Sequence, residues 1–212
     1  MKLYGYWRSS ASYRLRIALN LKGIEREEVE INLLNGEHRG PEYLAVNPQG
    51  LVPAIEEGGR IFGQSLAILE YLEETHPNPP LLPGHPVERA RVRQLALLIA
   101  CEIHPLQNSG VRQHLRKAHG FDSNAEDAWV KHWILNGLAA LEALVAGHSE
   151  TGTFCHGDTP TLADICLVPQ LYNARRGRCD LAPYPSLVRI DEKCLGLDAF
   201  ARAAPEQQAH AR

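Results

Sequence analysis

The sequence predicts a two-part chain, in which a small α/β unit is followed by an all-helical unit. Strand and helix patterns alternate over residues 2–75. Five prolines then fall between Pro77 and Pro86, a density that neither a helix nor a central strand tolerates. Beyond them we find helical periodicity only. We therefore expect domains at residues 1–80 and 87–212, joined by a stiff linker.

The α/β unit begins with a strand and a capped helix. Ser9, Ser10 and Ser12 are N-cap residue types, and the apolar positions after them follow helical spacing up to Gly23, a helix-ending residue. A hairpin-like turn at Glu57-Gly58-Gly59 joins two later strands. The expected elements, in chain order, are strand Lys2–Tyr6, a helix from Ala11, strands Val29–Leu33, Leu51–Ile55 and Arg60–Phe62, and helix Ser65–Thr75.

The region after the linker carries separate helical stripes. Their apolar positions are Val92, Leu95, Ala96 and Ile99 on one face, and Ile134, Leu138, Leu141 and Val145 on another. Thr161 and Asp164 have the spacing of a capping box and predict a further helix start. We expect Pro169 to kink or shorten that helix, and the polar tail Ala204–Arg212 to fray.

Composition narrows the class of function. The 212 residues carry a net charge of −3, which argues against nucleic acid or an anionic membrane as the main partner. No apolar run is long enough to span a bilayer, and the first residues lack the pattern of a secretory signal. The five cysteines are odd in number and widely spaced and form no CxxC motif, so we expect reduced thiols. The histidines form no HExxH motif, so we expect no metal site. These features together lead us to expect a cytoplasmic location.

The first candidate site is the junction of the first strand and the first helix. A helix N-terminus offers unpaired N–H groups and partial positive charge, which stabilise anions including thiolates. One serine suffices for a cap, so three serines next to Arg8 favour a site over simple capping.

Two further signals lie later in the same unit. The Val52-Pro53 bond precedes a strand, and a cis bond there would expose the main chain of Val52 to an extended ligand, although an edge-strand proline fits the same pattern. Gln64-Ser65 opens a helix, where Ser65 either caps the helix or also holds a carboxylate.

These three signals lie in stretches that resemble zeta-class glutathione transferases, and most of all their bacterial maleylacetoacetate isomerases. The stretches are YWRSSASYRLRIALNLKGI, NPQGLVPAI and GQSLAILEYLEE, and the likeness continues through CEIHPLQN and GDTPTLADICLVPQLYNARR to about residue 205. The resemblance implies a thioredoxin-like N-terminal domain, a helical C-terminal domain, glutathione in the cleft between them, and a homodimer.

The resemblance also implies roles for individual residues. Ser9, with Ser10 close by, would activate the glutathione sulfur, and Arg8 and Arg176 would attract substrate carboxylates. The residues implied to contact glutathione are Ser9, Ser10, His38, Gln49, Val52 before a cis Pro53, Gln64 and Ser65, with Glu102, His104 and Asn108 from the second domain.

The implied activity is glutathione-dependent cis–trans isomerisation of maleylacetoacetate in aromatic amino-acid breakdown. Two alternatives remain: isomerisation of maleylpyruvate from gentisate, and transfer of glutathione to small electrophiles such as α-halo acids. The chain departs from the family pattern at Ala11, where many members have cysteine, and at Gly177-Arg178, where an aromatic residue is usual. Residues 108–110 lack the arginines of some maleylpyruvate isomerases, which weakens that alternative.

Overall fold

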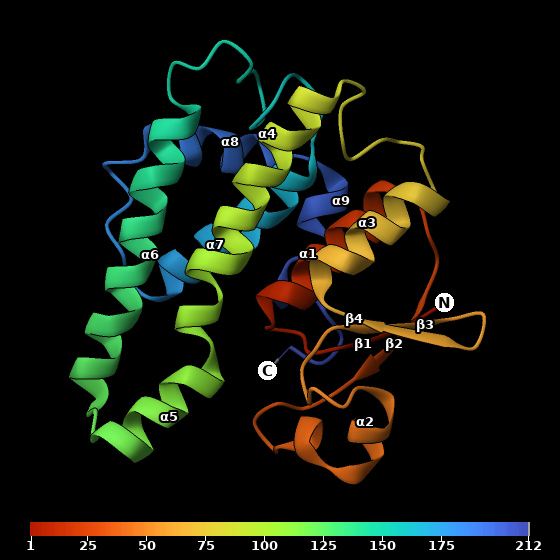
Figure 1. Cartoon of the computed structure of the whole chain (residues 1–212), viewed down its shortest axis with the longest axis vertical. Coiled ribbons are helices and arrows are strands. Elements are labelled where there is room, and N and C mark those ends of the chain that lie inside the picture. Colours follow the sequence, from red (N-terminus) through yellow and green to blue (C-terminus); the bar gives the residue numbers. More distant parts are fainter. Residues whose placement is uncertain (212) are drawn as a thin grey trace. The chain divides into compact units, whose positions relative to one another are not determined.

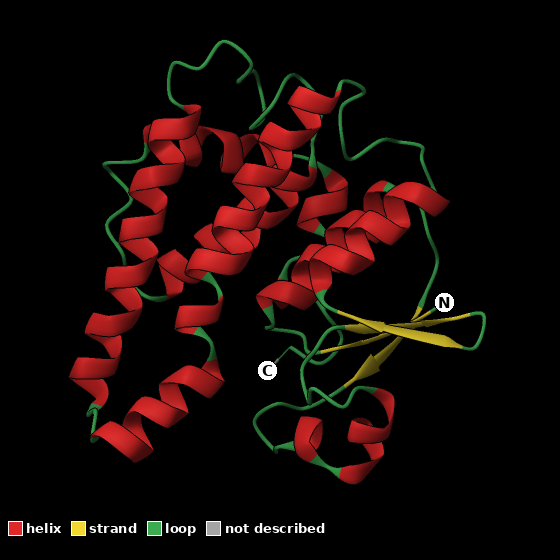
Figure 2. Cartoon of the chain, in the orientation of Figure 1, coloured by secondary structure: helices red, strands yellow, loops and turns green. Residues whose placement is uncertain are grey.

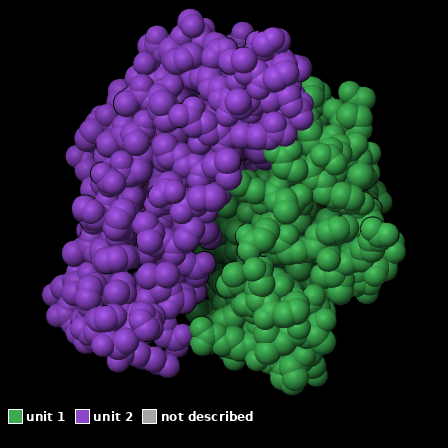
Figure 3. Space-filling model, viewed as in Figure 1, with its two compact units in different colours: residues 1–81, 195–212 green, residues 82–194 purple. Residues whose placement is uncertain are grey.

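A computed structural model of the chain describes residues 1–211. The chain forms two compact units, one of residues 1–81 and 195–212 and the other of residues 82–194 (Figure 3). The sequence-based division at 1–80 and 87–212 differs from these units at the C-terminal end, because residues from Leu195 onward pack with the first unit.

The first unit is built on a four-stranded mixed sheet in the order β2-β1-β3-β4 (Figure 1). Its strands are β1 (Lys2–Gly5), β2 (Glu27–Glu30), β3 (Ala54–Glu57) and β4 (Arg60–Gly63). β1 is parallel to β2 and antiparallel to β3, and β3 is antiparallel to β4. Helices α1 (Ser10–Leu21) and α3 (Ser65–Thr75) cover one face of the sheet, and α2 (Pro41–Val46) lies on the other. This is the thioredoxin-like arrangement that the resemblance implies.

Two strands begin at different residues from those that the sequence predicts. β2 starts at Glu27 rather than Val29, because its polar residues pair in register with β1 at the edge of the sheet, where one side remains unpaired. β3 starts at Ala54 rather than Leu51, because the chain turns at Gly50, with φ +60°, and then passes through the cis Val52-Pro53 bond. Helix α3 has the predicted bounds, Ser65–Thr75.

The residues that lead into the predicted tail pack on α1, and the tail begins with a buried residue, Pro205, whereas fraying of its later residues stays a prediction. Phe200 of helix α9 (Asp198–Ala201) and Pro205 of the 3₁₀ turn η4 (Pro205–Gln207) are buried. The guanidinium of Arg16 donates from Nε to the carbonyl of Ala203 at 3.0 Å, and Asn20 Nδ2 donates to the carbonyl of Ala199 at 2.9 Å. These polar contacts fasten the residues that lead into the tail to α1.

The proline-rich segment is fastened to the first unit by a buried lysine. The side chain of Lys22 is fully buried, and its Nζ donates to Glu73 Oε2 at 3.0 Å and to the carbonyls of His76 and Pro79 at 2.6 and 2.9 Å. Glu73 Oε2 also accepts the N–H of Leu81 at 2.9 Å. No helix or strand occurs between His76 and His85, as predicted, but residues 76–81 of the segment are held by these contacts.

The second unit contains helices and no strand, as predicted, all of its residues being described (Figure 2). Its elements are α4 (Pro86–Leu97), the π-helix η2 (Leu98–Ile103), the 3₁₀ turn η3 (Pro105–Gln107), α5 (Ser109–His119), α6 (Ser123–Val145), α7 (Leu162–Arg176) and α8 (Pro185–Leu195), whose last residue belongs to the first unit. Neither this unit nor the rest of residues 1–211 offers a helix with the length and apolarity that a membrane span requires.

Helix α7 begins as predicted but does not end early. The Thr161 N–H donates to Asp164 Oδ2 at 2.8 Å, which completes the capping box. Pro169 lies inside the helix, which continues to Arg176, because the buried residues around it pack tightly enough to offset the lost hydrogen bond. Gly137 of α6 is required by close packing, since a Cβ there would lie 2.2 Å from Cγ1 of Ile103 in the π-helix.

We predict that Lys22→Met lowers the free energy of unfolding by about 3 to 5 kcal/mol, because it leaves the Glu73 carboxylate buried without its cation. Denaturant unfolding of the two proteins measures the difference. Lys2→Met is the matched control: Lys2 and Glu27 are 4.0 Å apart and exposed, so its cost is at most about 1 kcal/mol. Equal effects of the two substitutions would contradict the role of Lys22.

Candidate active site

The candidate site in the first unit is one edge of the sheet, where three neighbouring strands have their ends. Tyr4 of β1 pairs with Ala54 of β3, and Ala54 pairs with Gly63 of β4. The end of β1, the start of β3 and the end of β4 therefore lie together. The start of α1 follows β1, the start of α3 follows β4, and the Val52-Pro53 bond directly precedes β3. The register therefore brings the three predicted segments to one edge.

At the start of α1 the serines have separate roles. Ser9 is the N-cap, and its Oγ accepts the N–H of Ser12 at 3.2 Å, which leaves the hydroxyl hydrogen of Ser9 able to donate elsewhere. Ser12 is fully buried, and its Oγ accepts the N–H of Tyr6 at 3.3 Å, so this serine joins the helix to the end of β1. Ser10 is also buried, at the first helical position. Ser9 is the most accessible of the three hydroxyls.

The Val52-Pro53 bond is cis, as expected, and the loop before it is held rigidly. The carbonyl of Leu51 accepts from the Tyr43 hydroxyl and from Asn47 Nδ2, both at 2.7 Å. The main-chain N–H and C=O of Val52 form no hydrogen bond within residues 1–211. An extended peptide can therefore pair with this residue as with an edge strand.

His38 and Gln49 approach the same edge from the preceding loop. His38 lies in the 3₁₀ turn η1 (Glu37–Arg39), and Gly50 packs so closely on this turn that a Cβ would lie 2.9 Å from the carbonyl oxygen of His38. Burial, and then the charge of Arg39, lower the pKa of His38. Gln49 Oε1 accepts from Gln64 Nε2 at 3.0 Å, which ties this loop to the start of α3.

The start of α3 is polar, strained and uncapped. Gln64 has φ +66°, a conformation that non-glycine residues rarely adopt, and its side chain does not cap the helix. Ser65 is buried, and its Oγ accepts a hydrogen bond from Nη1 of Arg14 at 3.2 Å. The first-turn N–H groups of α3 therefore remain available to an anion.

Sequence reasoning missed Arg14. This arginine lies on the apolar face of α1, between Ala11 and Ala18 in helical spacing, and is 2% exposed. A charged residue within an apolar stripe was the available signal, since a buried arginine requires partners that the stripe itself cannot supply.

Arg8 lies at the same strand end, toward the β2 side. Its guanidinium lies over the Trp7 ring, 5.3 Å from the centroid, a cation–π arrangement. Arg8, Trp7 and Glu30 line a cavity of about 220 Å³ together with Tyr6, Asn32, Leu34 and His210. Burial raises the pKa of Glu30, against the opposing effects of the Trp7 N–H and nearby cations.

The remaining predicted residues belong to the second unit. Glu102 is exposed on the π-helix, and His104 joins this helix to η3. Asn108 caps α5, its Oδ1 accepting the N–H of Gly110 at 3.3 Å, so it has a structural role in addition to any binding role. Arg176 is exposed at the end of α7, 5.9 Å from the Tyr172 ring centroid.

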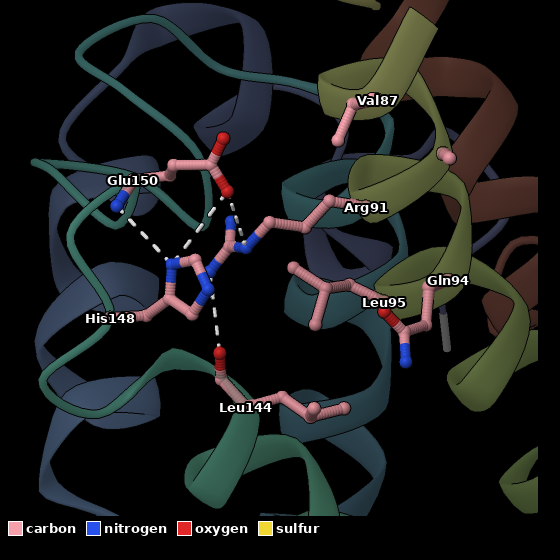
Figure 4. Close-up of a pocket in the computed structure, with 8 residues that line it drawn as sticks. Val87, Arg91, Gln94, Leu95, Leu144, His148 and Glu150 are labelled. Atoms are coloured by element: carbon pink, nitrogen blue, oxygen red, sulfur yellow. Dashed lines mark hydrogen bonds and ion pairs between the residues drawn. The ribbon is translucent and has the colours of Figure 1, made fainter.

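A larger cavity in the second unit contains none of the predicted residues. It has a volume of about 520 Å³, and the residues that line it include Val87, Leu95, Leu144, His148 and Glu150 (Figure 4). Its arginine, Arg91, donates to the carbonyls of Cys155 and Leu144, to Thr151 Oγ1, and lies 3.5 Å from Glu150. These contacts occupy the guanidinium in joining α4 to the 144–156 segment. Within residues 1–211 no three His, Cys, Asp or Glu side chains are placed to hold a metal ion.

Comparison with known proteins assigns the family. Residues 3–80 match the family described as glutathione S-transferase, N-terminal domain, and residues 125–192 match glutathione S-transferase, C-terminal domain. The chain belongs to the glutathione S-transferase family. This glutathione S-transferase is 53% identical to a maleylacetoacetate isomerase of Rhizobium meliloti over 97% of the chain and 96% of the relative. It is 50% identical to a maleylpyruvate isomerase of a Ralstonia species over 98% of both.

Solved structures agree with the fold and the class. A holo structure of a bacterial zeta-class maleyl pyruvate isomerase matches with a TM-score of 0.98 at 48% identity, over the whole of both chains. A maleylacetoacetate isomerase of Methylobacterium extorquens, with malonate and glutathione bound, matches with a TM-score of 0.97 at 45% identity, again over both whole chains. The expectation of a zeta-class glutathione transferase fold is confirmed.

We predict that Gln64→Gly raises the free energy of unfolding by about 1 kcal/mol, because glycine adopts the positive φ without strain. Denaturant unfolding measures the change. Gln64→Ala is the control, since alanine loses the amide but keeps the unfavourable backbone conformation, and it should not stabilise the protein. A Gly variant no more stable than the Ala variant would contradict strain at this residue.

Proposed function

We propose that this glutathione S-transferase is a glutathione-dependent cis–trans isomerase that converts maleylacetoacetate to fumarylacetoacetate. The observation that carries the proposal is the sheet edge, where two helix N-termini follow the ends of β1 and β4 and the unpaired Val52 peptide precedes the start of β3. Relatives named maleylacetoacetate isomerase, at 53% and 46% identity, support the choice of substrate.

Glutathione fits this edge by its chemistry. A carboxylate suits the uncapped start of α3 with the buried hydroxyl of Ser65, an extended peptide suits the unpaired main chain of Val52, and a thiolate suits the start of α1. We assign the sulfur to Ser9 and Ser10, the cysteinyl part to Val52 before Pro53, the γ-glutamyl end to Gln64 and Ser65, and the remaining backbone to His38 and Gln49.

When bound, glutathione supplies a thiolate that adds to the conjugated double bond of the diacid and leaves after rotation about the resulting single bond. A thiol with a pKa of about 8.5 is only roughly 3% ionised at pH 7. Lowering that pKa by about two units makes the thiolate the majority form, which requires about 2.7 kcal/mol. The free hydrogen of Ser9 and the positive end of α1 are suited to this task.

We further propose that Arg8 and Arg176 bind the carboxylates of the dianionic substrate and offset the charge that develops during addition. Glu102, His104 and Asn108 remain proposed glutathione contacts from the helical domain, 87–212. These assignments rest on the family resemblance, with Arg8 also supported by its position beside Trp7 at the end of β1.

Maleylpyruvate is the second candidate substrate. The 48% identical zeta-class structure and the 50% identical Ralstonia relative are both named maleylpyruvate isomerases. The absence of arginine at residues 108–110 favours maleylacetoacetate.

Absorbance-monitored isomerisation of each diacid, with and without glutathione, tests the function. We expect faster, glutathione-dependent loss of maleylacetoacetate. If the protein prefers maleylpyruvate, the proposed mechanism stands but the enzyme belongs to gentisate breakdown. Turnover that is equal with and without glutathione would refute both, and release of chloride from dichloroacetate without isomerisation would identify a transferase of α-halo acids.

The proposed location is the cytoplasm, supported by five cysteines that form no disulfide within residues 1–211. We also propose, from the family resemblance, that the protein is a homodimer. Sedimentation velocity of the purified protein measures its oligomeric state.

We predict that Ser9→Ala lowers the turnover number by about 10- to 100-fold while changing glutathione affinity less, because it removes a hydrogen bond to the thiolate. Steady-state kinetics and calorimetry measure the two effects. Ser9→Thr keeps the hydroxyl and should retain most of the turnover. If Ser9→Ala changes neither quantity and Ser10→Ala lowers turnover, Ser10 has the role instead.

We predict that Arg176→Ala raises the Michaelis constant for the diacid by about tenfold, since it removes one charge-assisted contact, and leaves glutathione affinity nearly unchanged. Arg175→Ala is the neighbouring control. Arg175 lies 2.6 Å from the buried Asp191 carboxylate, so its loss should lower stability without raising the Michaelis constant. An unchanged constant in Arg176→Ala would exclude a carboxylate role.

A further inference from the structure

The buried guanidinium of Arg14 lies at the start of α3, and the protein provides hydrogen-bond acceptors for only some of its N–H groups. Arg14 is 2% exposed, and its Nη1 donates to Ser65 Oγ at 3.2 Å. Its Nε and Nη2 are buried and have no hydrogen-bond partner within residues 1–211, and no described carboxylate pairs with it. A buried cation without a counter-ion is costly, so an arginine kept in this state indicates a role beyond packing.

Arg16, two residues further along the same helix, is a buried arginine with a structural role and serves for comparison. It is equally buried, and it donates from Nε to the carbonyl of Ala203 at 3.0 Å and from Nη2 to the carbonyl of Trp7 at 2.8 Å. Arg16 thus joins the C-terminal tail to the end of β1. Arg14 joins α1 to only one hydroxyl, at the first residue of a helix that lacks a side-chain cap.

The contact with Arg14 sets the direction of the Ser65 hydrogen bond. A guanidinium has donors only, so Ser65 Oγ must be the acceptor in this pair. The hydroxyl hydrogen of Ser65 is then directed to another acceptor, and the first-turn N–H groups of α3 are donors as well. Hydroxyl, N–H groups and guanidinium charge together make an environment that favours a carboxylate.

We propose that Arg14 is a positioning residue for the α-carboxylate at the γ-glutamyl end of glutathione. It acts through Ser65, whose hydroxyl it turns into a donor, and through a positive charge placed behind the start of α3. This inference rests on the proposed function, because it takes glutathione to be the bound peptide. It predicts that Arg14 governs recognition of one carboxylate and not of the tripeptide as a whole.

Calorimetric binding of two peptides tests the proposal. One is glutathione, and the other is γ-aminobutyryl-cysteinylglycine, which is glutathione without that α-carboxylate. We expect wild type to prefer glutathione by at least about tenfold, and Arg14→Met to lose about tenfold of that preference, which corresponds to about 1.4 kcal/mol. The affinity of Arg14→Met for the peptide without the α-carboxylate should differ little from that of wild type.

Four further variants distinguish a role of Arg14 in carboxylate recognition from a role in folding. Arg16→Met is the matched control, and should lower stability but keep the preference of wild type. Arg14→Lys keeps the positive charge but loses the planar guanidinium, and it should retain part of the preference for glutathione. Ser65→Ala should reduce the preference, and adding Arg14→Met to it should cost less than the two single effects combined, because the residues act as one unit.

The outcomes distinguish this proposal from the proposed function. If wild type does not bind glutathione, the proposed function fails first. If wild type binds both peptides equally, or if Arg14→Met keeps the preference for glutathione, the role of Arg14 is refuted while the isomerase assignment stands. Should Arg14→Met fail to fold, Arg14→Lys and Ser65→Ala decide, and an unchanged preference in both refutes the role.

Discussion

The candidate site depends on one constraint, the reversal of direction between β1 and β3. Because β3 is antiparallel to β1 and β4 is antiparallel to β3, the end of β1, the start of β3 and the end of β4 share one edge of the sheet. Were β3 parallel to β1, the Val52 peptide would lie at the opposite edge from the start of α1. The reversal thus collects two helix N-termini and one free main-chain segment without any long loop.

The site combines groups that a folded protein ordinarily pairs internally. The main chain of Val52 is unpaired within the described residues, the start of α3 is uncapped, Gln64 is strained, and Arg14 is buried with one partner. The strain at Gln64 and the burial of Arg14 cost free energy in the free protein. An anionic peptide bound at this edge would provide hydrogen-bond acceptors for the unpaired N–H groups and a negative charge for Arg14.

Stability is provided elsewhere, by polar contacts that are fully satisfied. Lys22 donates to three acceptors and holds the linker, Arg16 holds the C-terminal tail, and Asp164 accepts from Thr161 and from the N–H of Cys155 at the start of α7. These side chains are buried as Arg14 is, yet all of them have partners within their own unit. The contrast separates buried charge that supports the fold from buried charge that serves the site.

Local pattern determined much of this protein. Alternating apolar spacing, proline density and cap residues predicted both classes of unit, helix α3 to the residue and the capping box, because these depend on neighbours in the chain. The cis Val52-Pro53 bond was implied by the motif resemblance, since the local pattern also fitted an edge-strand proline. The motif resemblance supplied the family. Only the tertiary structure decided where β2 and β3 begin, that residues 198–203 pack on α1, that Pro169 lies within a continuous helix, and that Arg14 contacts Ser65. The start of β2, the packing on α1 and the contact between Arg14 and Ser65 depend on pairing between residues far apart in sequence, whose geometry no local spacing encodes.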